Sequence, residues 1–246
     1  MSTTLRLAVI ADVHGNALAL EAVLADIAQR AVEVIVNLGD NANGPLEPAR
    51  SVALLRGSGA LHVRGNGDRA VAGAAGAAGA SATFARERLA ADDIAWLGKL
   101  PFEVRGDGWV AFHSTPVSDL EYLVETVEPH GARVATAAEI EERLRGVTEP
   151  LVLCAHSHVP RAIEFGDGRL VVNPGSVGLP AYRQSVPAPH VMEAGTRHAR
   201  YAIVERRGGR WTAELIALDY DWQQAAAQAR SFGWEEWARV LETGRA

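Results

Sequence analysis

The sequence predicts an α/β protein built on a parallel sheet. Three uncharged, strongly apolar runs carry this prediction, at about residues 7–11, 34–38 and 60–63. The first two runs are each followed by a polar turn and then by a stretch with helical spacing. Such runs are typical of strands buried on both faces, and the alternation of strand and helix is typical of parallel strands joined by right-handed crossovers.

The bulk composition narrows the class of protein. The chain has 246 residues, of which 48% are hydrophobic, a net charge of -6 and a single cysteine, Cys154. The negative charge argues against broad nucleic-acid binding, because a surplus of basic residues is needed to neutralise phosphates. One cysteine excludes an intrachain disulfide and is typical of a reducing compartment.

The chain shows no sign of targeting or of division into domains. No signal-peptide pattern precedes the first strand, and no apolar run approaches the length of a membrane span. We therefore expect a cytoplasmic protein without a membrane partner. With no repeat and no break in composition, we expect one domain over residues 1–246, with a core at about 5–218 and a C-terminal helical tail at 221–246.

Helices are expected in the first half of the chain at 17–29, 48–55 and 83–97. The first of these follows Asn16, which is a good N-cap residue. Residues 70–80 contain only alanine, valine and glycine, with glycine at every third position. Glycine weakens a helix, so this stretch is expected to be a poor helix or a loop that serves as a connector or as a lid over a site.

The second half is expected to contain hairpins. Apolar segments flank glycine-containing turns at 102–112, 161–173 and 201–218. Another buried strand is expected at 151–155. Residues 180–198 hold several prolines and little periodicity, which predicts a long loop.

Residues that can bind metals follow the predicted strands. They are Asp12, His14, Asp40, Asn66, Asp68, His113, His156, His158 and Asn173. Functional groups gather at the carboxyl ends of strands in open α/β sheets, so we expect one common site. If the first strand continues through Asp12 and His14, both side chains point the same way, because side chains alternate with a period of two. Taken alone this pair is more typical of a capping turn, but its recurrence at other strand ends favours a site.

These residue types suit a site for two transition-metal ions. Asp and His bind divalent Mn, Fe, Zn or Ni, and the carbonyl oxygen of an Asn side chain is a neutral ligand. One carboxylate, such as that of Asp40, can bridge two ions about 3.5–4 Å apart. Two such ions lower the pKa of a shared water and neutralise phosphoryl oxygens during in-line attack, so no side-chain nucleophile is needed.

The order of these motifs resembles the calcineurin-like metallophosphoesterase superfamily, and within it the compact bacterial phosphoesterase and phosphodiesterase branch. The shared pattern is D-x-H, G-D, G-N-x-D, H, A-H-x-H and N-P-G-S, and it extends from residue 5 to about 218. The resemblance implies an α/β (α+β) fold of four layers, an αββα sandwich of two mixed sheets flanked by helices. It also implies a hydrolase that acts on phosphoric ester bonds with a binuclear metal centre.

The resemblance further implies a role for each matching residue. One metal ion would be held by Asp12, His14 and His158, the other by Asn66, His113 and His156, with Asp40 as the bridge. Asn173, in the N-P-G-S turn, would support the site without binding a metal.

One position departs from the pattern. In many relatives a histidine follows the asparagine of the third motif and protonates the leaving group, whereas this chain has Gly67 there. A glycine cannot transfer a proton, which favours phosphodiesters over simple alkyl monoesters. Asp68 is a candidate replacement acid. The alternative is that its carboxylate orients Asn66 or pairs with a neighbouring arginine.

The substrate is expected to be a small phosphorylated molecule whose selection depends on residues 68–95 and 178–198. Arg183 is a candidate to bind a phosphate oxygen, with an exposed arginine outside the site as the alternative. His190 lies beside the proline-containing loop, from which it could reach a substrate, but no role is assigned to it. The tryptophans of the C-terminal tail are available for packing or for a contact within a homo-oligomer.

Three functions remain open from the sequence. The first is a binuclear metal-dependent phosphoesterase in which metal-bound hydroxide attacks phosphorus, with a preference for diesters because of Gly67. The second is a phosphomonoesterase, or a phosphatase acting on proteins or nucleotides. The third is a metal-binding scaffold with weak turnover, which the complete set of seven metal ligands argues against.

Overall fold

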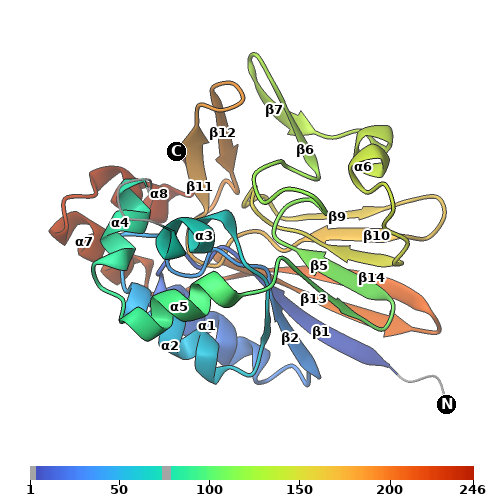
Figure 1. The fold of residues 1–246 in the computed structure, drawn as a ribbon, viewed down its shortest axis with the longest axis horizontal. Helices are drawn as coiled ribbons and strands as arrows, with labels where there is room; N and C mark the ends of the chain where they lie inside the picture. The colour runs from blue at the N-terminus through green and yellow to red at the C-terminus, as the bar shows by residue number, and fades with distance from the viewer. Residues whose placement is uncertain (1–3, 74–78) are drawn as a thin grey trace.

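Two five-stranded mixed sheets pack face to face in the computed structural model, which describes residues 4–73 and 79–246 (Figure 1). In order across the first sheet lie β14 (Arg210–Leu218), β13 (Ala199–Arg207), β1 (Leu5–Ile10), β2 (Val34–Asn37) and β3 (Leu61–His62). In order across the second lie β4 (Glu103–Gly106), β5 (Trp109–Phe112), β8 (Leu151–Leu153), β10 (Leu170–Asn173) and β9 (Arg161–Glu164).

Both sheets contain three neighbouring parallel strands, at one side of the first sheet and in the centre of the second. In the first sheet β1 pairs in parallel with β2, and β2 with β3, while β13 runs antiparallel to β1. In the second sheet β5, β8 and β10 are parallel neighbours, and the outer strands β4 and β9 are antiparallel to them. The parallel strands therefore supply the edge at which a shared site can form.

Side-chain alternation along the central strands divides the core into layers. Leu7 and Val9 of β1 face the second sheet and belong to the same buried cluster as Leu151 and Leu153 of β8. Ile10 points the other way, toward the helices outside the first sheet. Strands that are buried on both faces in this way require an apolar residue at nearly every position, which is why their runs carry no charge.

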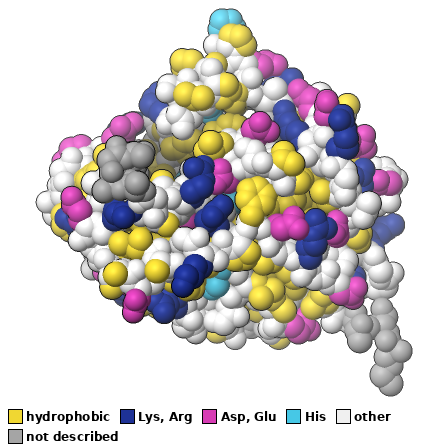
Figure 2. Space-filling view, in the orientation of Figure 1, with side chains coloured by type: hydrophobic (Ala, Val, Ile, Leu, Met, Phe, Trp, Pro, Cys, Tyr) yellow, Lys and Arg dark blue, Asp and Glu magenta, His cyan; other side chains and the backbone are white. Residues whose placement is uncertain are grey.

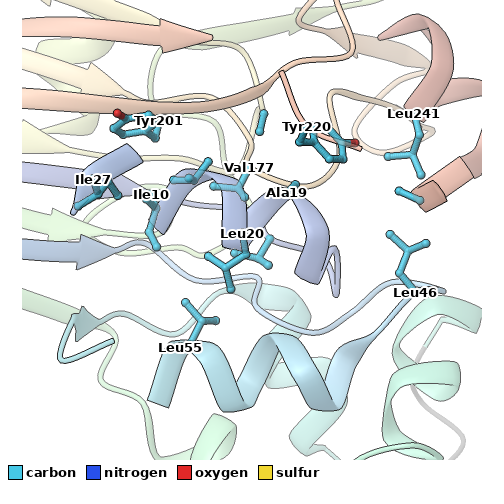
Figure 3. Packing of buried hydrophobic residues seen from close by; sticks show 14 of the residues in the cluster. Ile10, Ala19, Leu20, Ile27, Leu46, Leu55, Val177, Tyr201, Tyr220 and Leu241 are labelled. Atoms are coloured by element: carbon cyan, nitrogen blue, oxygen red, sulfur yellow. The ribbon is translucent and has the colours of Figure 1, made fainter. Parts of the chain in front are cut away.

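Helices cover the outer faces of both sheets unequally. The first sheet is covered by α1 (Ala17–Ile27), α2 (Pro48–Gly57), α7 (Trp222–Ser231) and α8 (Glu235–Thr243). Figure 3 shows this packing, with Leu20 of α1 and Leu55 of α2 between these two helices. Tyr220, just before α7, and Leu241 of α8 belong to the same cluster. The outer face of the second sheet is covered by α6 (Ala137–Arg143), through Ile140. These layers confirm the predicted αββα sandwich.

Three further helices lie beside the end of the sheets. They are α3 (Asn66–Ala72), α4 (Ala80–Arg86) and α5 (Ala91–Lys99), and they share a small apolar cluster around Val71 and Leu97. No helix in the described ranges is both long and apolar enough to cross a membrane. The proposed lid or connector at 70–80 is helical up to Ala72, and its portion at 74–78 lies outside the described residues.

Two predicted elements differ from the structure. The helix expected at 83–97 is two helices, α4 and α5, because Ala90 adopts an extended backbone with ψ 154° and starts α5 as its N-cap. The loop expected at 180–198 contains a hairpin of β11 (Ala181–Gln184) and β12 (His190–Glu193). Pro187 and Pro189 lie in the connection between these strands, so they do not interrupt the pairing.

A second small hairpin, β6 (Glu125–Glu128) with β7 (Gly131–Val134), lies in a part of the chain for which the sequence predicts no element. In Figure 1 both hairpins project on the same side of the two large sheets.

Candidate metal centre

The seven predicted ligands meet where the parallel strands of both sheets end. Two groups of three have ligand atoms that all lie within 4.8 Å of one another: Asp12, His14 and His158, and Asp12, Asp40 and His113. Each group takes residues from both sheets, since Asp12 follows β1 and the partners His158 and His113 follow β8 and β5. Both sheets of the sandwich therefore contribute ligands to one polar site.

The first group is compact. The Nε2 atoms of His14 and His158 are 3.1 Å apart. Oδ1 of Asp12 lies 3.4 Å from Nε2 of His158 and 3.9 Å from Nε2 of His14. One cation placed between these three atoms would contact all of them.

Asp40 lies between the two sides of the site. Its Oδ2 is 3.8 Å from Nε2 of His14, and its Oδ1 is 3.7 Å from Nε2 of His113. On the far side, the amide of Asn66 has one terminal atom 3.0 Å from Nε2 of His113 and 3.0 Å from Nδ1 of His156. A carboxylate with one oxygen toward each side has the position that a bridging ligand requires.

All four histidines are oriented by main-chain carbonyls. Nδ1 of His14, His113 and His158 lies 3.0, 2.7 and 2.6 Å from the carbonyl oxygens of Asn43, Leu38 and Leu179, and Nε2 of His156 lies 3.1 Å from that of Leu120. A ring nitrogen that donates to a carbonyl fixes the tautomer, so the other nitrogen presents its lone pair to the site. This is the arrangement by which proteins prepare histidine for a metal.

Burial also fits a cation. Asp12 is completely buried, and neither of its carboxylate oxygens has a hydrogen-bond partner. Burial acts to raise the pKa of Asp12, but the neighbouring histidines, His158 foremost, outweigh this and hold that pKa well below its usual range. Burial lowers the pKa of His156 to about 4, with a further contribution from His113, which keeps this imidazole neutral as a metal ligand must be. A buried charge with two free acceptors fits a bound metal ion.

The backbone at the site is strained in a consistent way. Six non-glycine residues in the described ranges have positive φ, and five of them are predicted ligands: Asp12 (54°), His14 (51°), Asp40 (57°), His156 (70°) and His158 (61°). Such conformations are uncommon outside glycine and cluster at functional sites. The expectation that the first strand continues through Asp12 and His14 is wrong, because β1 ends at Ile10 and left-handed turns aim these side chains.

Asp68 is held away from the open side of the site. Its carboxylate is fully buried and accepts hydrogen bonds from the main-chain N–H groups of Asp40, Asn41 and Gly65 and from the Asn41 side chain, at 2.9–3.0 Å. Burial and the nearby Asp40 raise the pKa of Asp68 to about 7, against the lowering effect of these donors. Both oxygens are thus engaged in positioning the Asp40 loop and the start of α3.

The two supporting residues differ in their surroundings. Asn173 donates from Nδ2 to the carbonyl of Ala155 at 3.1 Å and to Oγ of Ser157 at 3.0 Å, which braces the loop of His156 and His158. Arg183 is exposed, and its Nη2 donates to the carbonyl of Ala246 at 2.6 Å.

The structure adds Asn43, which the sequence does not single out. A Cβ atom placed on Gly67 would lie 2.1–2.3 Å from the three outer atoms of the Asn43 amide. The side chain of Asn43 thus fills the space that a side chain at position 67 would need. The Oδ1 atom of Asn43 is buried without a hydrogen-bond partner, and its main-chain carbonyl accepts a hydrogen bond from Nδ1 of His14. Only the fold brings positions 43 and 67 together, so no sequence pattern marks the pair.

A second group missed by the sequence supports His156. The hydroxyl of Tyr182 donates to the carbonyl of His156 at 2.9 Å and lies 2.8 Å from the hydroxyl of Tyr122. The ring of Tyr122 stacks on His156 with centroids 5.0 Å apart, and its hydroxyl lies 2.9 Å from Nε2 of the buried His190. In Figure 2 basic side chains gather near the middle of the drawn face, around the position of α3.

Comparison with known families identifies the chain. The model of the calcineurin-like phosphoesterase superfamily domain matches residues 5–194. The chain belongs to the calcineurin-like phosphoesterase superfamily. It is accordingly a metallophosphoesterase, a hydrolase of phosphoric ester bonds from a metal-dependent family, and the Asp and His groups described above can bind metal.

Three proteins resemble this chain over most of its length. An uncharacterised protein of Methanocaldococcus jannaschii is 27% identical, with 89% of each chain covered. The crystal structure of a metallophosphoesterase from Sphaerobacter thermophilus is 26% identical and superposes with a TM-score of 0.76 over 98% of this phosphoesterase and 100% of that chain. A hypothetical protein of Pyrococcus horikoshii OT3 is 20% identical, with a TM-score of 0.73 and 98% of each chain covered, and it shares the fold.

Proposed function

We propose that this phosphoesterase hydrolyses phosphodiesters of small molecules at two divalent metal ions. The observation that supports it is the convergence of four imidazoles, each oriented by a main-chain carbonyl, with a buried Asp12 that has no hydrogen-bond partner. In this proposal one ion is held by Asp12, His14 and His158 and the other by Asn66, His113 and His156, with Asp40 between them. The nitrogen and oxygen donors suit Mn, Fe, Zn or Ni.

The bound ions would supply the nucleophile, by acidifying water, and would neutralise the phosphoryl oxygens. The protein's own residues set the geometry. Main-chain N–H groups and Asp68 fix the Asp40 loop, and the N–H of Gly67 donates to Oδ1 of Asp40 at 2.6 Å. We assign Asp68 to positioning rather than to proton transfer, because four donors already occupy its carboxylate.

The preference for diesters follows from position 67. Gly67 offers no acidic side chain, and the Asn43 amide that fills its space is able to donate a hydrogen bond but does not release a proton. Leaving groups that depart without full protonation suffer least from this exchange. An aryl diester is such a substrate, whereas an alkyl monoester is not.

The test uses metal-stripped protein to which Mn, Ni, Zn or Mg is returned. Hydrolysis of bis(p-nitrophenyl) phosphate is compared with that of p-nitrophenyl phosphate, and bound metal is counted by elemental analysis. We expect two ions per chain, metal-dependent turnover and a higher kcat/KM for the diester. Asp40→Asn should lower kcat/KM by about a thousandfold or more, since it weakens both ion sites. Asp167→Asn, in an exposed turn remote from the site, serves as the control.

Other outcomes would identify other functions. A higher kcat/KM for the aryl monoester would establish a phosphomonoesterase. Hydrolysis of an alkyl monoester at a rate close to that of the aryl esters would remove the argument from Gly67, because only the alkyl leaving group depends on a proton donor. Two ions bound per chain without hydrolysis of either ester would identify a metal-binding scaffold. One ion per chain with full activity would contradict the two-metal arrangement.

A further inference from the structure

A cleft of about 600 Å³ opens beside the candidate metal centre. Two proposed ligands, Asn66 and His156, belong to its lining, so the cleft and the metal site are continuous. The remaining walls come from residues 120–127, which lead into β6, from Arg143 of α6, and from residues 184–187 at the turn of the β11–β12 hairpin. Cavities of this size bind small molecules.

The walls of this cleft present exposed apolar side chains. Leu120 is 58% exposed and Val186 is 71% exposed, and they line the cleft from different segments. Val127, Pro187 and the ring of Tyr122 extend the same apolar surface. Exposed apolar groups that line the same cleft favour a ligand that removes them from water.

The charged residues of the lining do not form a site for an anion. Arg143 directs its N–H groups to two main-chain carbonyls and to the hydroxyl of Thr126. Glu125 is buried and paired with Arg161, and Glu121 adds a further carboxylate. A second phosphate group, or a carboxylate, would therefore meet negative charge and no arginine free to form a bidentate pair within this lining.

We propose that the cleft selects substrates that carry one phosphoryl group and a bulky, uncharged hydrophobic substituent. The phosphoryl group lies at the metal ligands, and an aryl or similar apolar group lies between Leu120 and Val186. This inference rests on the proposed function, because that function places the phosphorus atom. It excludes diphosphates, polyphosphates and doubly phosphorylated sugars as preferred substrates.

The test measures binding of stable phosphonates to the metal-loaded protein by isothermal titration calorimetry. Methylphosphonate, phenylphosphonate, 1-naphthylphosphonate and 4-carboxyphenylphosphonate share one phosphoryl-like group and differ in the substituent. We expect Kd to fall about tenfold or more from the methyl to the aryl ligands, with a negative heat-capacity change that marks apolar burial. The carboxyphenyl ligand should bind more weakly than the phenyl ligand.

Two variants locate the effect. Val186→Glu should bring the ratio of methyl to phenyl Kd close to one. Val117→Glu introduces the same charge at a valine that is 84% exposed but does not line the cleft, so it should leave that ratio unchanged. Equal Kd values for methyl and phenyl ligands, tighter binding of the carboxyphenyl ligand, or an unchanged ratio in Val186→Glu would overturn the proposal.

Failure of the proposed function gives a different pattern. In that case neither methylphosphonate nor any aryl phosphonate binds in a metal-dependent manner, and neither aryl phosphate ester is hydrolysed. If methylphosphonate binds only with metal while the aryl groups add nothing, the metal site stands and the cleft assignment alone is wrong.

Discussion

Two loops of the site use the same local structure in different surroundings. The loop after β1 carries Asp12 and His14, and the loop after β8 carries His156 and His158. In each loop both ligands have positive φ and enclose one buried residue. The two sheets thus contribute matching ligand pairs, but different contacts hold each pair in place.

The first loop is held by the sandwich itself. Main-chain bonds join Asp12 to Gly39 at 2.9 Å and His14 to Asp40 at 2.9 Å, and Gly178 donates to the carbonyl of Asp12 at 3.0 Å. The second loop is held in part by side chains that line or adjoin the cleft. Tyr182 binds the carbonyl of His156, and Tyr122 stacks on its ring. Stability should therefore depend more on the first loop, and the response to substrate more on the second.

The largest effect on stability is expected at Asn16. Its side chain caps α1 through Ala19 at 3.2 Å, donates to the carbonyl of Gly178 at 3.0 Å and lies 3.2 Å from the hydroxyl of Tyr220. Asn16→Ala should lower the free energy of unfolding by about 2–4 kcal/mol, because the cap is lost and buried groups are left unpaired. Urea denaturation measures this loss. Asn16→Ser keeps the cap, so its free energy of unfolding should lie between those of the parent protein and Asn16→Ala. A loss below about 1 kcal/mol in Asn16→Ala would contradict the role given to the first loop.

A steric test at Gly67 reaches the first loop through Asn43. Gly67→His should lower the free energy of unfolding by about 1–3 kcal/mol, because the new side chain displaces the side-chain amide of Asn43. The main-chain carbonyl of the same residue orients His14. The double variant Gly67→His with Asn43→Ala should regain most of that loss. It should also raise the kcat/KM of an alkyl monoester relative to the aryl diester by about tenfold or more, because an alkoxide leaving group needs a proton and an imidazole beside it supplies an acid.

Thermal denaturation and paired ester assays of the single and double variants check this. A single Gly67→His variant as stable as the parent protein would show that Asn43 moves freely. An unchanged ratio of monoester to diester turnover in the double variant would remove the link between position 67 and ester preference.

A pair of tyrosine variants separates the two loops. Tyr182→Phe removes the hydroxyl that binds His156, and Tyr220→Phe removes the hydroxyl beside Asn16. Each should lower the free energy of unfolding by about 0.5–1.5 kcal/mol, the usual worth of one hydrogen bond. Only Tyr182→Phe should also lower kcat/KM, by about tenfold, because a small displacement of a ligand is costly to the reaction. Equal kcat/KM values in the two variants would contradict the different roles assigned to the two loops.

The smallest effect is expected at Arg183. This residue is exposed on β11, and its guanidinium contacts the carbonyl of Ala246. Arg183→Ala should change the kcat/KM of the aryl diester by less than about twofold, as surface substitutions usually do. A steady-state assay decides this, and a tenfold loss would restore Arg183 as a phosphate contact and make the β11–β12 hairpin part of the phosphoryl site.

The sequence is informative where short periodic patterns carry the signal. The apolar runs that end in Asp12, Asp40 and His156 can be recognised because a doubly buried strand excludes polar residues until it ends. The same logic predicts the parallel strands β1, β2 and β3 of the first sheet. The aiming of the ligands is not predictable in this way, since left-handed backbone at Asp12 and His14 leaves no mark on the residue spacing.

Contacts between distant segments are the part that sequence reasoning misses. Asn43 and Gly67 are 24 positions apart, and Tyr122 and Tyr182 are 60 apart, so neither pair belongs to one periodic element. The β11–β12 hairpin is hidden for a different reason. Its prolines and short apolar stretches are typical of a loop. Only the structure shows that the two strands pair and that a side chain such as Met192 is buried.

The five left-handed ligand residues, four in the two loops and Asp40 beside them, link folding to the supply of metal. Each costs about 1 kcal/mol or more, so five of them together approach the net stability of an ordinary domain, about 5–15 kcal/mol. An ion that binds only the folded chain returns part of this, about 2.7 kcal/mol when its free concentration is a hundred times Kd. The melting temperature of this protein should therefore rise with the free metal concentration of its surroundings, and the fraction of folded protein should fall when metal is scarce.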